Sequence, residues 1–358
     1  MEVFFIKTHK LRNDNTDDKL KEKYLEFEIL FEGGIFVELA GIHHVSAITA
    51  DAEKNFDFFT RILGMRLVKK SVNQDNTSSY HLFYADAVGT PGTDMTYFDI
   101  PRAAKTIPGA SSISNTAFRV KSEAALTYWK ERFTQHQVHF EKVVERFGRK
   151  TMYFEDFEGS RLMLVVDDGK GVPYGIPWTK SGVPEEFTIV GLGHVTLTVR
   201  KAQQTQLVLT EVLGFKKVGA YPSNVATMPD ITVYSTGEGG PASEVHIEER
   251  PDLPLERPGR GSVHHVAFRV KTFEDYDKWE ELLRAKGFMT SGKVDRYYFK
   301  SIYFREPNGI LYELATDEPG FATDESLDTL GETLALPPFL EPRREQIEAS
   351  LRPLTFKE

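Results

Sequence analysis

The sequence contains no cysteine. This absence excludes disulfide bonds, thiolate zinc sites, iron–sulfur clusters and a cysteine nucleophile, so any bound metal ion must take His, Asp or Glu as ligands. A basic excess is also absent, since 44 Lys and Arg stand against 53 Asp and Glu and give a formal net charge of −9. We therefore expect no nucleic-acid partner.

Long apolar runs are missing as well. No uninterrupted apolar stretch approaches the ~18 residues that a membrane helix needs, and the apolar run at the N-terminus is too short for a signal-peptide core. We expect no membrane partner and a cytoplasmic location. The 358 residues, 40% hydrophobic and 27% charged, have the composition of a soluble globular protein, and their number suggests two domains.

Residues 1–38 match none of the patterns that organise the rest of the chain, and we expect a flexible tail or a short helix there. We also hypothesise that the residues before Val37 are not translated in the native protein. The run Glu-Gly-Gly-Ile at 32–35 can be encoded as GAAGGAGGTATT, which contains a ribosome-binding purine tract upstream of Val37 as a GTG start. A native N-terminal peptide that contains Lys7 or Lys10 would disprove this hypothesis.

The chain repeats itself with a constant offset of 150 residues. The run Ala-Phe-Arg-Val-Lys occupies residues 117–121 and again 267–271, and Trp129 recurs as Trp279. The first parts of the two halves agree more weakly. Two copies of one domain account for this pattern.

The predicted domains span residues 42–168 and 190–318, followed by a tail at 319–358. In that tail, Glu341-Pro-Arg predicts the start of a short helix. Each domain divides again into two units with the order strand, helix and three strands, which gives four βαβββ modules. We expect an α+β fold in which the modules pair into two curved sheets, because a single module leaves one sheet face unburied and a concave pair forms a pocket.

Equivalent positions of the four modules can be compared within this one chain. The first-strand position is occupied in turn by His44, Asn115, His194 and His265, and the last-strand position by Thr96, Met163, His246 and Glu313. Glu313 lies in an apolar strand, where a carboxylate without a partner is costly, so it needs a cation. Two imidazoles and one carboxylate on one face of a metal ion form the facial triad of non-haem Fe(II) oxygenases.

The pairing of the modules decides which imidazole completes the triad. If the first module pairs with the fourth, the set is His44, His265 and Glu313, with Thr96 in the fourth place. If the third pairs with the fourth, His194 replaces His44 and His246 lies nearby. The sequence separation does not decide between them, but the adjacent pairs at 43–44 and 264–265, both His-His, favour the first set.

At these residues the sequence resembles the vicinal-oxygen-chelate superfamily, and within it the hydroquinone-type ring-cleaving dioxygenases. The group that it resembles includes bacterial enzymes of methylhydroquinone and catechol resistance, with the chlorohydroquinone dioxygenases as relatives. The likeness covers residues 41 to about 355 and rests on the segments Gly41–Ser46, Tyr80–Phe83, Gly89–Thr93, Val263–Phe268, Gly309–Glu313 and Leu336–Arg344.

The resemblance implies that His44, His265 and Glu313 hold Fe(II), with Mn(II) as an alternative metal. It further implies that the catalytic side chains near the substrate are His43, His264, Arg296, Tyr303 and Ser46, where Ser46 stands in place of a threonine in relatives. His194 and His246 match the ligand and acid/base positions of catechol-cleaving relatives and stay open as an alternative site.

The implied activity is a non-haem Fe(II) extradiol-type cleavage of hydroquinone- or catechol-type dihydroxybenzenes, with dioxygen as co-substrate and a role in aromatic or quinone detoxification. His43 or His264 would take the phenolic proton, and Arg296 would hold negative charge on the substrate. Two alternatives are a glyoxalase-like metal-dependent isomerase or lyase and a metal-free protein that binds an aromatic compound or drug. A homo-oligomer is compatible with the sequence.

Overall fold

A computed structural model describes residues 37–356 of the chain. The hypotheses on the N-terminal tail and on translation before Val37 concern residues outside this range. Among the described residues, no helix is both long and apolar enough to cross a membrane.

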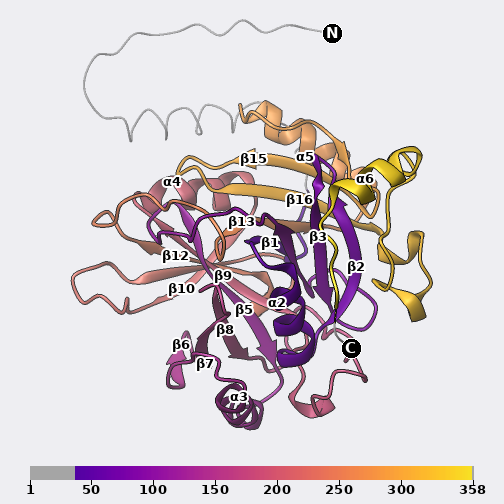
Figure 1. Cartoon of the computed structure of the whole chain (residues 1–358). Coiled ribbons are helices and arrows are strands. Elements are labelled where there is room, and N and C mark those ends of the chain that lie inside the picture. The colour runs from indigo at the N-terminus through magenta and orange to yellow at the C-terminus, as the bar shows by residue number, and fades with distance from the viewer. Residues whose placement is uncertain (1–36, 357–358) are drawn as a thin grey trace, which may run out of the picture. The chain divides into compact units, whose positions relative to one another are not determined.

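The chain forms four modules, each with one strand, one helix and three further strands, as the repeat predicts (Figure 1). The first contains β1 (Ile42–Thr49), α2 (Ala52–Asp57), the π-helical turn η1 (Phe58–Ile62), β2 (Arg66–Asn73), β3 (Asn76–Ala85) and β4 (Asp94–Asp99). The second contains β5 (Ser112–Val120), α3 (Glu123–Gln135), β6 (Val144–Arg146), β7 (Arg149–Glu155) and β8 (Arg161–Val166).

The second half of the chain repeats this order. The third module contains β9 (Leu192–Val199), α4 (Ala202–Leu207), η3 (Val208–Val212), β10 (Lys216–Tyr221), β11 (Ile231–Ser235) and β12 (Glu244–Glu249). The fourth contains β13 (Val263–Val270), α5 (Phe273–Ala285), β14 (Val294–Asp295), β15 (Phe299–Arg305) and β16 (Leu311–Pro319). Short 3₁₀ turns lie at η2 (Glu185–Phe187), η4 (Pro241–Ser243), η5 (Phe321–Thr323), η6 (Leu327–Thr329) and η7 (Glu341–Arg343), and the last of them leads into the predicted C-terminal helix α6 (Arg344–Ser350).

Local sequence signals fix where the helices begin. The side chains of Asp51, Ser122 and Thr272 accept a hydrogen bond from a backbone N–H in the first turn of α2, α3 and α5. The helices of the first and third modules both pass into a π-helical turn at positions 150 residues apart, η1 and η3. Alternate modules are therefore the closer copies of each other.

The modules pair across the two halves of the sequence. One sheet has the strand order β14-β15-β16-β13-β1-β4-β3-β2, and the other has the order β10-β11-β12-β9-β5-β8-β7-β6. The first module thus joins the fourth through the antiparallel strands β1 and β13, and the second joins the third through β5 and β9 (Figure 1). Within each module the first strand is parallel to the last, as in β1 with β4 and β13 with β16.

The first-and-fourth sheet is supported by an apolar cluster that crosses the module boundary. It joins residues of β2 and β3 to residues of β13 and β16, to the start of β15 and to the segment after β16, namely Val68, Phe83, Ala85, Ala267, Tyr298, Phe299, Ala315, Phe321 and Leu330. Arg66 ties that last segment down, because its guanidinium donates to the carbonyl oxygens of Leu327 and Asp328. The strands that carry the candidate site are therefore held on a packed apolar base.

Candidate metal centre

His44, His265 and Glu313 converge in the first-and-fourth sheet, as one of the two predicted sets requires. His44 lies on β1, His265 on β13 and Glu313 on β16, which are neighbours in the strand order. Glu313 Oε2 is 2.8 Å from His265 Nε2 and 3.2 Å from His44 Nε2, and the two Nε2 atoms are 3.4 Å apart. All three residues are buried, and their ligand atoms lie within 4.8 Å of one another.

The carboxylate of Glu313 is only half satisfied by hydrogen bonds. Ser301 Oγ donates to its Oε1, but Oε2 is a buried atom without a hydrogen-bond partner among the described residues. Burial raises the pKa of Glu313, yet the imidazoles of His44 and His265 outweigh it and hold that pKa well below the usual value. An ionised oxygen in this position needs a cation.

A hydrogen-bonded chain fixes which nitrogen of His44 faces that oxygen. His43 Nε2 lies 3.1 Å from the carbonyl oxygen of Thr316, which only accepts, so this nitrogen carries the proton. Burial lowers the pKa of His43 well below its usual value, so the ring is neutral and its Nδ1 accepts from His44 Nδ1 at 2.9 Å. His44 Nε2 is then free to bind a metal ion.

His265 is arranged in a similar way. Its Nδ1 is 2.7 Å from Nδ1 of His264, and its Nε2 faces Glu313. In both His44 and His265, Nδ1 is thus hydrogen-bonded to the preceding histidine, and Nε2 points toward the same oxygen of Glu313. A histidine ligand whose other nitrogen is hydrogen-bonded in this way is typical of protein metal sites. The residues present fit a divalent cation.

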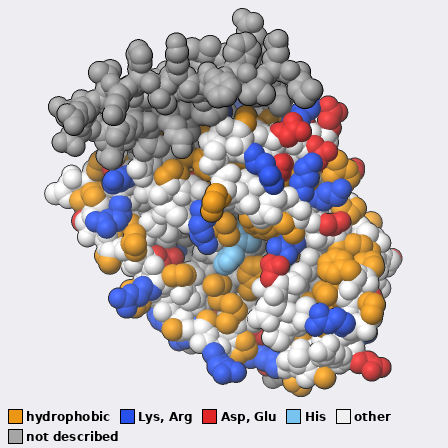
Figure 2. All heavy atoms as spheres, turned by 90° about the horizontal axis from the view of Figure 1, so that it is seen from above, with side chains coloured by type: hydrophobic (Ala, Val, Ile, Leu, Met, Phe, Trp, Pro, Cys, Tyr) orange, Lys and Arg blue, Asp and Glu red, His pale blue; other side chains and the backbone are white. Residues whose placement is uncertain are grey.

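The cluster lies at the wall of a cavity of about 390 Å³, which is within the range of small-molecule sites. Figure 2 shows histidine side chains exposed in the hollow, with hydrophobic and charged side chains around it. Its wall combines apolar and polar side chains, which include Ser46, Ile48, Asn73, His81, Phe98, Ile100, His264, Arg296, Tyr298, Phe299, Tyr303 and Leu311.

Three polar side chains on neighbouring strands form a separate chain of hydrogen bonds in this wall. Ser46 Oγ is 2.8 Å from Thr96 Oγ1, and His81 Nε2 is 2.8 Å from the same Thr96 atom. The His81 ring lies between Phe83 and Phe98, and burial lowers its pKa well below the usual value. Thr96, in the fourth place of the repeat comparison, is thus engaged by two side chains.

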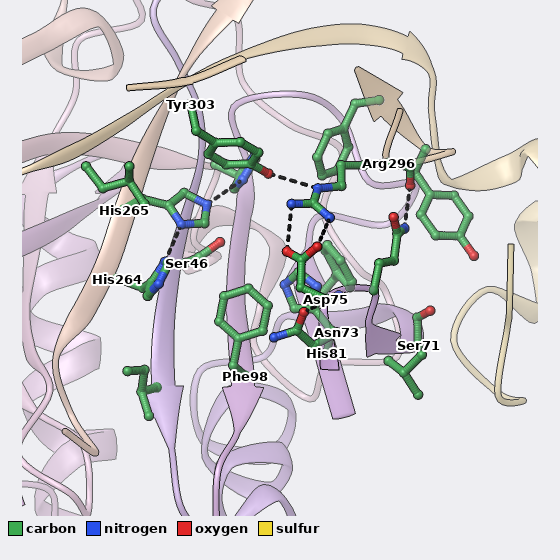
Figure 3. Close-up of a pocket in the computed structure, with 18 of the residues that line it drawn as sticks. Ser46, Ser71, Asn73, Asp75, His81, Phe98, His264, His265, Arg296 and Tyr303 are labelled. Carbon is green, nitrogen blue, oxygen red and sulfur yellow. Dashed lines mark hydrogen bonds and ion pairs between the residues drawn. The ribbon is translucent and has the colours of Figure 1, made fainter. Parts of the chain in front are cut away.

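Tyr303, on β15, lies beside His265 in the cavity wall, and Arg296, which follows β14, lies next to Tyr303 (Figure 3). Arg296 Nε donates to Tyr303 Oη at 3.2 Å, and its two terminal nitrogens donate to the carboxylate of Asp75 at 3.2 and 2.9 Å. The Tyr303 ring is 5.7 Å from that of His265. All the predicted site residues except His43 therefore reach the cavity wall or the cluster beside it, and His43 reaches the cluster through its bond to His44.

His194 and His246, the alternative ligands, lie in the second-and-third sheet. They form a buried group with Glu244, and their rings are stacked at 3.8 Å with an interplanar angle of 4°. Glu244 is already paired, because Arg149 donates to both of its oxygens at 2.8 Å and His246 Nε2 is 3.1 Å away. His194 and His246 therefore do not share a site with Glu313.

His81 and Asp75 are among the cavity residues to which the sequence analysis assigned no role. His81 lies on β3, two residues before Phe83 on the same face, and its strand position was the available signal. Asp75 lies in the turn between β2 and β3, where nothing in the local sequence indicates a contact with Arg296.

Comparison with known proteins identifies a family. The model of the Glyoxalase/Bleomycin resistance protein/Dioxygenase superfamily matches the chain twice, at residues 41–164 and 191–314. "Putative ring-cleaving dioxygenase MhqA" of Bacillus subtilis is 54% identical over 319 residues, which cover 89% of this chain and 100% of the relative. "Chlorohydroquinone/hydroquinone 1,2-dioxygenase" of Sphingobium indicum is 31% identical over 313 residues, 86% of this chain and 94% of the relative.

Solved structures agree with this result. A crystal structure of a "putative dioxygenase" from Bacillus subtilis has a TM-score of 0.81 and 34% identity, and covers 90% of this chain and 100% of its own. Glyoxalase I of Zea mays has a TM-score of 0.56 and 12% identity, with 77% of this chain and 92% of its own covered. The second likeness concerns the fold alone.

Proposed function

The chain belongs to the Glyoxalase/Bleomycin resistance protein/Dioxygenase superfamily, and we propose that it is an Fe(II)-dependent ring-cleaving dioxygenase of dihydroxybenzenes. The observation that carries this proposal is the buried Oε2 atom of Glu313, which faces the two imidazole nitrogens at 2.8 and 3.2 Å and has no other polar partner within residues 37–356. Two His and one carboxylate form the donor set of non-haem Fe(II) oxygenases, and Mn(II) accepts the same donors.

In this proposal His44, His265 and Glu313 hold the metal ion. When bound, Fe(II) supplies the redox chemistry with dioxygen and lowers the pKa of a coordinated ring hydroxyl. Ser301 holds the outer oxygen of Glu313, and His43 and His264 hold the outer nitrogens of the two imidazoles. These contacts keep the three donor atoms turned toward one point.

The remaining residues bind and orient the substrate. The apolar walls at Phe98, Phe299 and Leu311 are suited to an aromatic ring. Because both nitrogens of His43 are engaged, we assign the contact with a ring hydroxyl to His264, whose ring lines the cavity. When His265 Nε2 holds the metal ion, His265 Nδ1 donates to His264 Nδ1, so the Nε2–H of His264 is left to donate to a substrate oxygen, and this replaces its predicted role as the acceptor of the phenolic proton. A hydroquinone- or catechol-type diol is the substrate class, the ring opening is of the extradiol type, and the role is removal of aromatic or quinone compounds in the cytoplasm.

The wall of the cavity disfavours the glyoxalase-like alternative. Such an isomerase surrounds its metal ion with four protein ligands, and the fourth place is taken here by Thr96, whose hydroxyl is engaged by Ser46 and His81. A metal-free binding protein would have no use for a buried carboxylate oxygen at Glu313 that faces only two imidazole nitrogens, because a buried carboxylate is costly without a cation.

Oxygen consumption tests the proposal. The purified chain is reconstituted with Fe(II) without oxygen, and dioxygen uptake is then followed with methylhydroquinone and with catechol. We expect uptake of one dioxygen per ring, and we expect His44→Ala to lose both iron and uptake. Full iron content and full uptake in His44→Ala would remove His44 from the site, and isomerase activity without oxygen uptake would overturn the proposal.

A further inference from the structure

Two side chains of opposite charge face each other at the cavity wall away from the His–Glu cluster. Arg296 follows β14, and Asp75 lies in the turn between β2 and β3. Because β14 and β2 are the two outer strands of the first-and-fourth sheet, this contact joins the two edges of the sheet around the cavity. Figure 3 shows the Asp75 carboxylate directed at the Arg296 guanidinium.

Asp75 and Tyr303 occupy the two edges of the Arg296 guanidinium that can bind a carboxylate. A carboxylate binds arginine with two bonds either through both terminal nitrogens or through Nε and one terminal nitrogen. Asp75 occupies both terminal nitrogens at 3.2 and 2.9 Å, and Tyr303 Oη accepts from Nε at 3.2 Å. Neither edge of the Arg296 guanidinium is therefore free to form two hydrogen bonds with a carboxylate of a ligand.

Other bonds hold the two partners in place. Gln74 Nε2 donates to the backbone carbonyl of Arg296 at 2.8 Å, and the backbone N–H of Asp75 donates to Asn73 Oδ1 at 2.9 Å. Arg296 is 18% exposed, whereas Asp75 is 73% exposed. The turn therefore contacts both the backbone and the side chain of Arg296. Because Asp75 is exposed, it can be replaced without opening the core.

The pair of Asp75 and Arg296 determines the net charge of the cavity wall. Apart from the His–Glu cluster, Asp75 and Arg296 are the formally charged residues of its wall among the residues that the structure describes, and their charges cancel. An uncharged diol meets no net charge there. A ring that carries a carboxylate meets the negative charge of Asp75 and an arginine that is already occupied, and like charges repel.

We propose that Asp75 is a specificity-determining residue, which occupies Arg296 and restricts the cavity to dihydroxybenzenes that carry no carboxylate group. This inference rests on the proposed function and narrows its substrate class. It also replaces the predicted role of Arg296 as the direct partner of a charged substrate with a role through Asp75. In the other half of the repeat, the position equivalent to Asp75 is Val225.

Ligand binding without turnover tests this proposal separately from the activity. Affinities for 4-hydroxybenzoate and 4-hydroxybenzamide are measured on the metal-loaded protein without oxygen, because these two ligands have similar shapes and differ in charge. The variants are Asp75→Asn, the double variant Asp75→Asn with Arg296→Met, and Asp277→Asn as a control. Asp277 is an exposed partner of Lys293 and is not part of the cavity wall.

We expect Asp75→Asn to shift the affinity ratio toward the carboxylate by about tenfold, Asp277→Asn to leave it unchanged, and the double variant to lose the gain. An unchanged ratio in Asp75→Asn, or the same shift with Arg296 replaced, would overturn the proposal. The ratio of kcat/KM for 2,5-dihydroxybenzoate over methylhydroquinone is expected to rise in parallel. If neither diol consumes oxygen, the proposed function fails, while the binding ratio still decides the role of Asp75.

Discussion

The two sheets of this chain contain repeat-equivalent strands in the same order, yet their concave faces hold different polar groups. With the offset of 150 residues, His44 corresponds to His194 and Thr96 to His246, while Glu313 corresponds to Met163. The second-and-third sheet therefore has two imidazoles but no acid at the position of Glu313. Its nearby acid is Glu244, which corresponds to the buried Asp94.

The partner of the acid differs as well. Glu244 is neutralised by Arg149, and the position equivalent to Arg149 in the first-and-fourth sheet is Phe299, whose ring lies 5.1 Å from that of His44. The imidazoles also differ in orientation, since His44 and His265 meet at 80° whereas His194 and His246 stack at 4°. Stacked rings direct their in-plane lone pairs side by side and not at one point. In the second-and-third sheet Arg149 supplies the positive charge beside the acid, and in the first-and-fourth sheet we propose that a metal ion supplies it.

Removal of the acid from each of the two sheets is expected to have the largest and most different effects. We expect Glu313→Gln to lower iron content from about one ion per chain to nearly zero and oxygen uptake by about 100-fold or more, because the only anionic donor is lost. Glu244→Gln, the matched variant, is expected to keep its iron. Elemental analysis and oxygen uptake measure both, and iron loss in Glu244→Gln with retention in Glu313→Gln would reverse the assignment.

Removal of Arg149 is expected to lower the stability of the second-and-third sheet. Arg149→Met leaves the buried carboxylate of Glu244 without its main partner, so we expect the free energy of unfolding in urea to fall by about 3 kcal/mol. The exposed pair of Lys150 with Glu145 gives a control, in which Lys150→Met is expected to leave the free energy of unfolding nearly unchanged. Equal stability of Arg149→Met and the parent chain would show that Arg149 does not act as the neutralising cation.

His43 is a further difference between the two sheets, because the equivalent residue of the other half is Gly193. His43→Leu removes the bond that fixes His44, and we expect the affinity for Fe(II) to fall by about 10- to 100-fold. The exposed His139→Leu is expected to change nothing. A metal titration without oxygen measures both variants, and an unaltered affinity in His43→Leu would mean that His44 is oriented by packing alone.

The smallest effect that we expect is the change of the unfolding free energy with pH. Burial raises the pKa of Glu244, but His246 and Arg149 outweigh it and keep that pKa below its usual value of 4.5. A lowered pKa means that the folded chain releases this proton more readily than the unfolded chain. The carboxylate therefore stabilises the fold above pH 4.5 and loses this contribution as the pH falls through its folded pKa.

The difference in unfolding free energy between the parent chain and Glu244→Gln isolates this contribution. We expect the difference to be largest near neutral pH and to shrink as the pH falls below 4.5. Urea unfolding at several pH values measures it. A difference that grows toward acid pH would contradict the assigned direction of the pKa shift.

Much of the fold follows from the sequence, because the offset of 150 residues defines the modules and the alternation within strands places His44 and Glu313 on the inner face. The pairing of the first module with the fourth does not follow from it, since four similar modules offer similar edges. The paired histidines at 43–44 and 264–265 favoured that choice, and the antiparallel contact of β1 with β13 confirms it.

Side-chain partners far apart in the sequence were harder to predict. The contact of Asp75 with Arg296 spans 221 residues and depends on how the sheet curves until its edges meet. The pair of Arg149 with Glu244 also joins two modules. Neither contact has a local sequence signal, because a charged residue in a turn or at a strand end is usually solvated.

Anomalous diffraction at the iron edge, on crystals loaded with Fe(II) without oxygen, shows where the metal ion binds. We predict one peak within bonding distance of His44 Nε2, His265 Nε2 and Glu313 Oε2, and none beside His194, Glu244 and His246. A peak at the second group, or full iron loading with no peak at Glu313, would contradict the account.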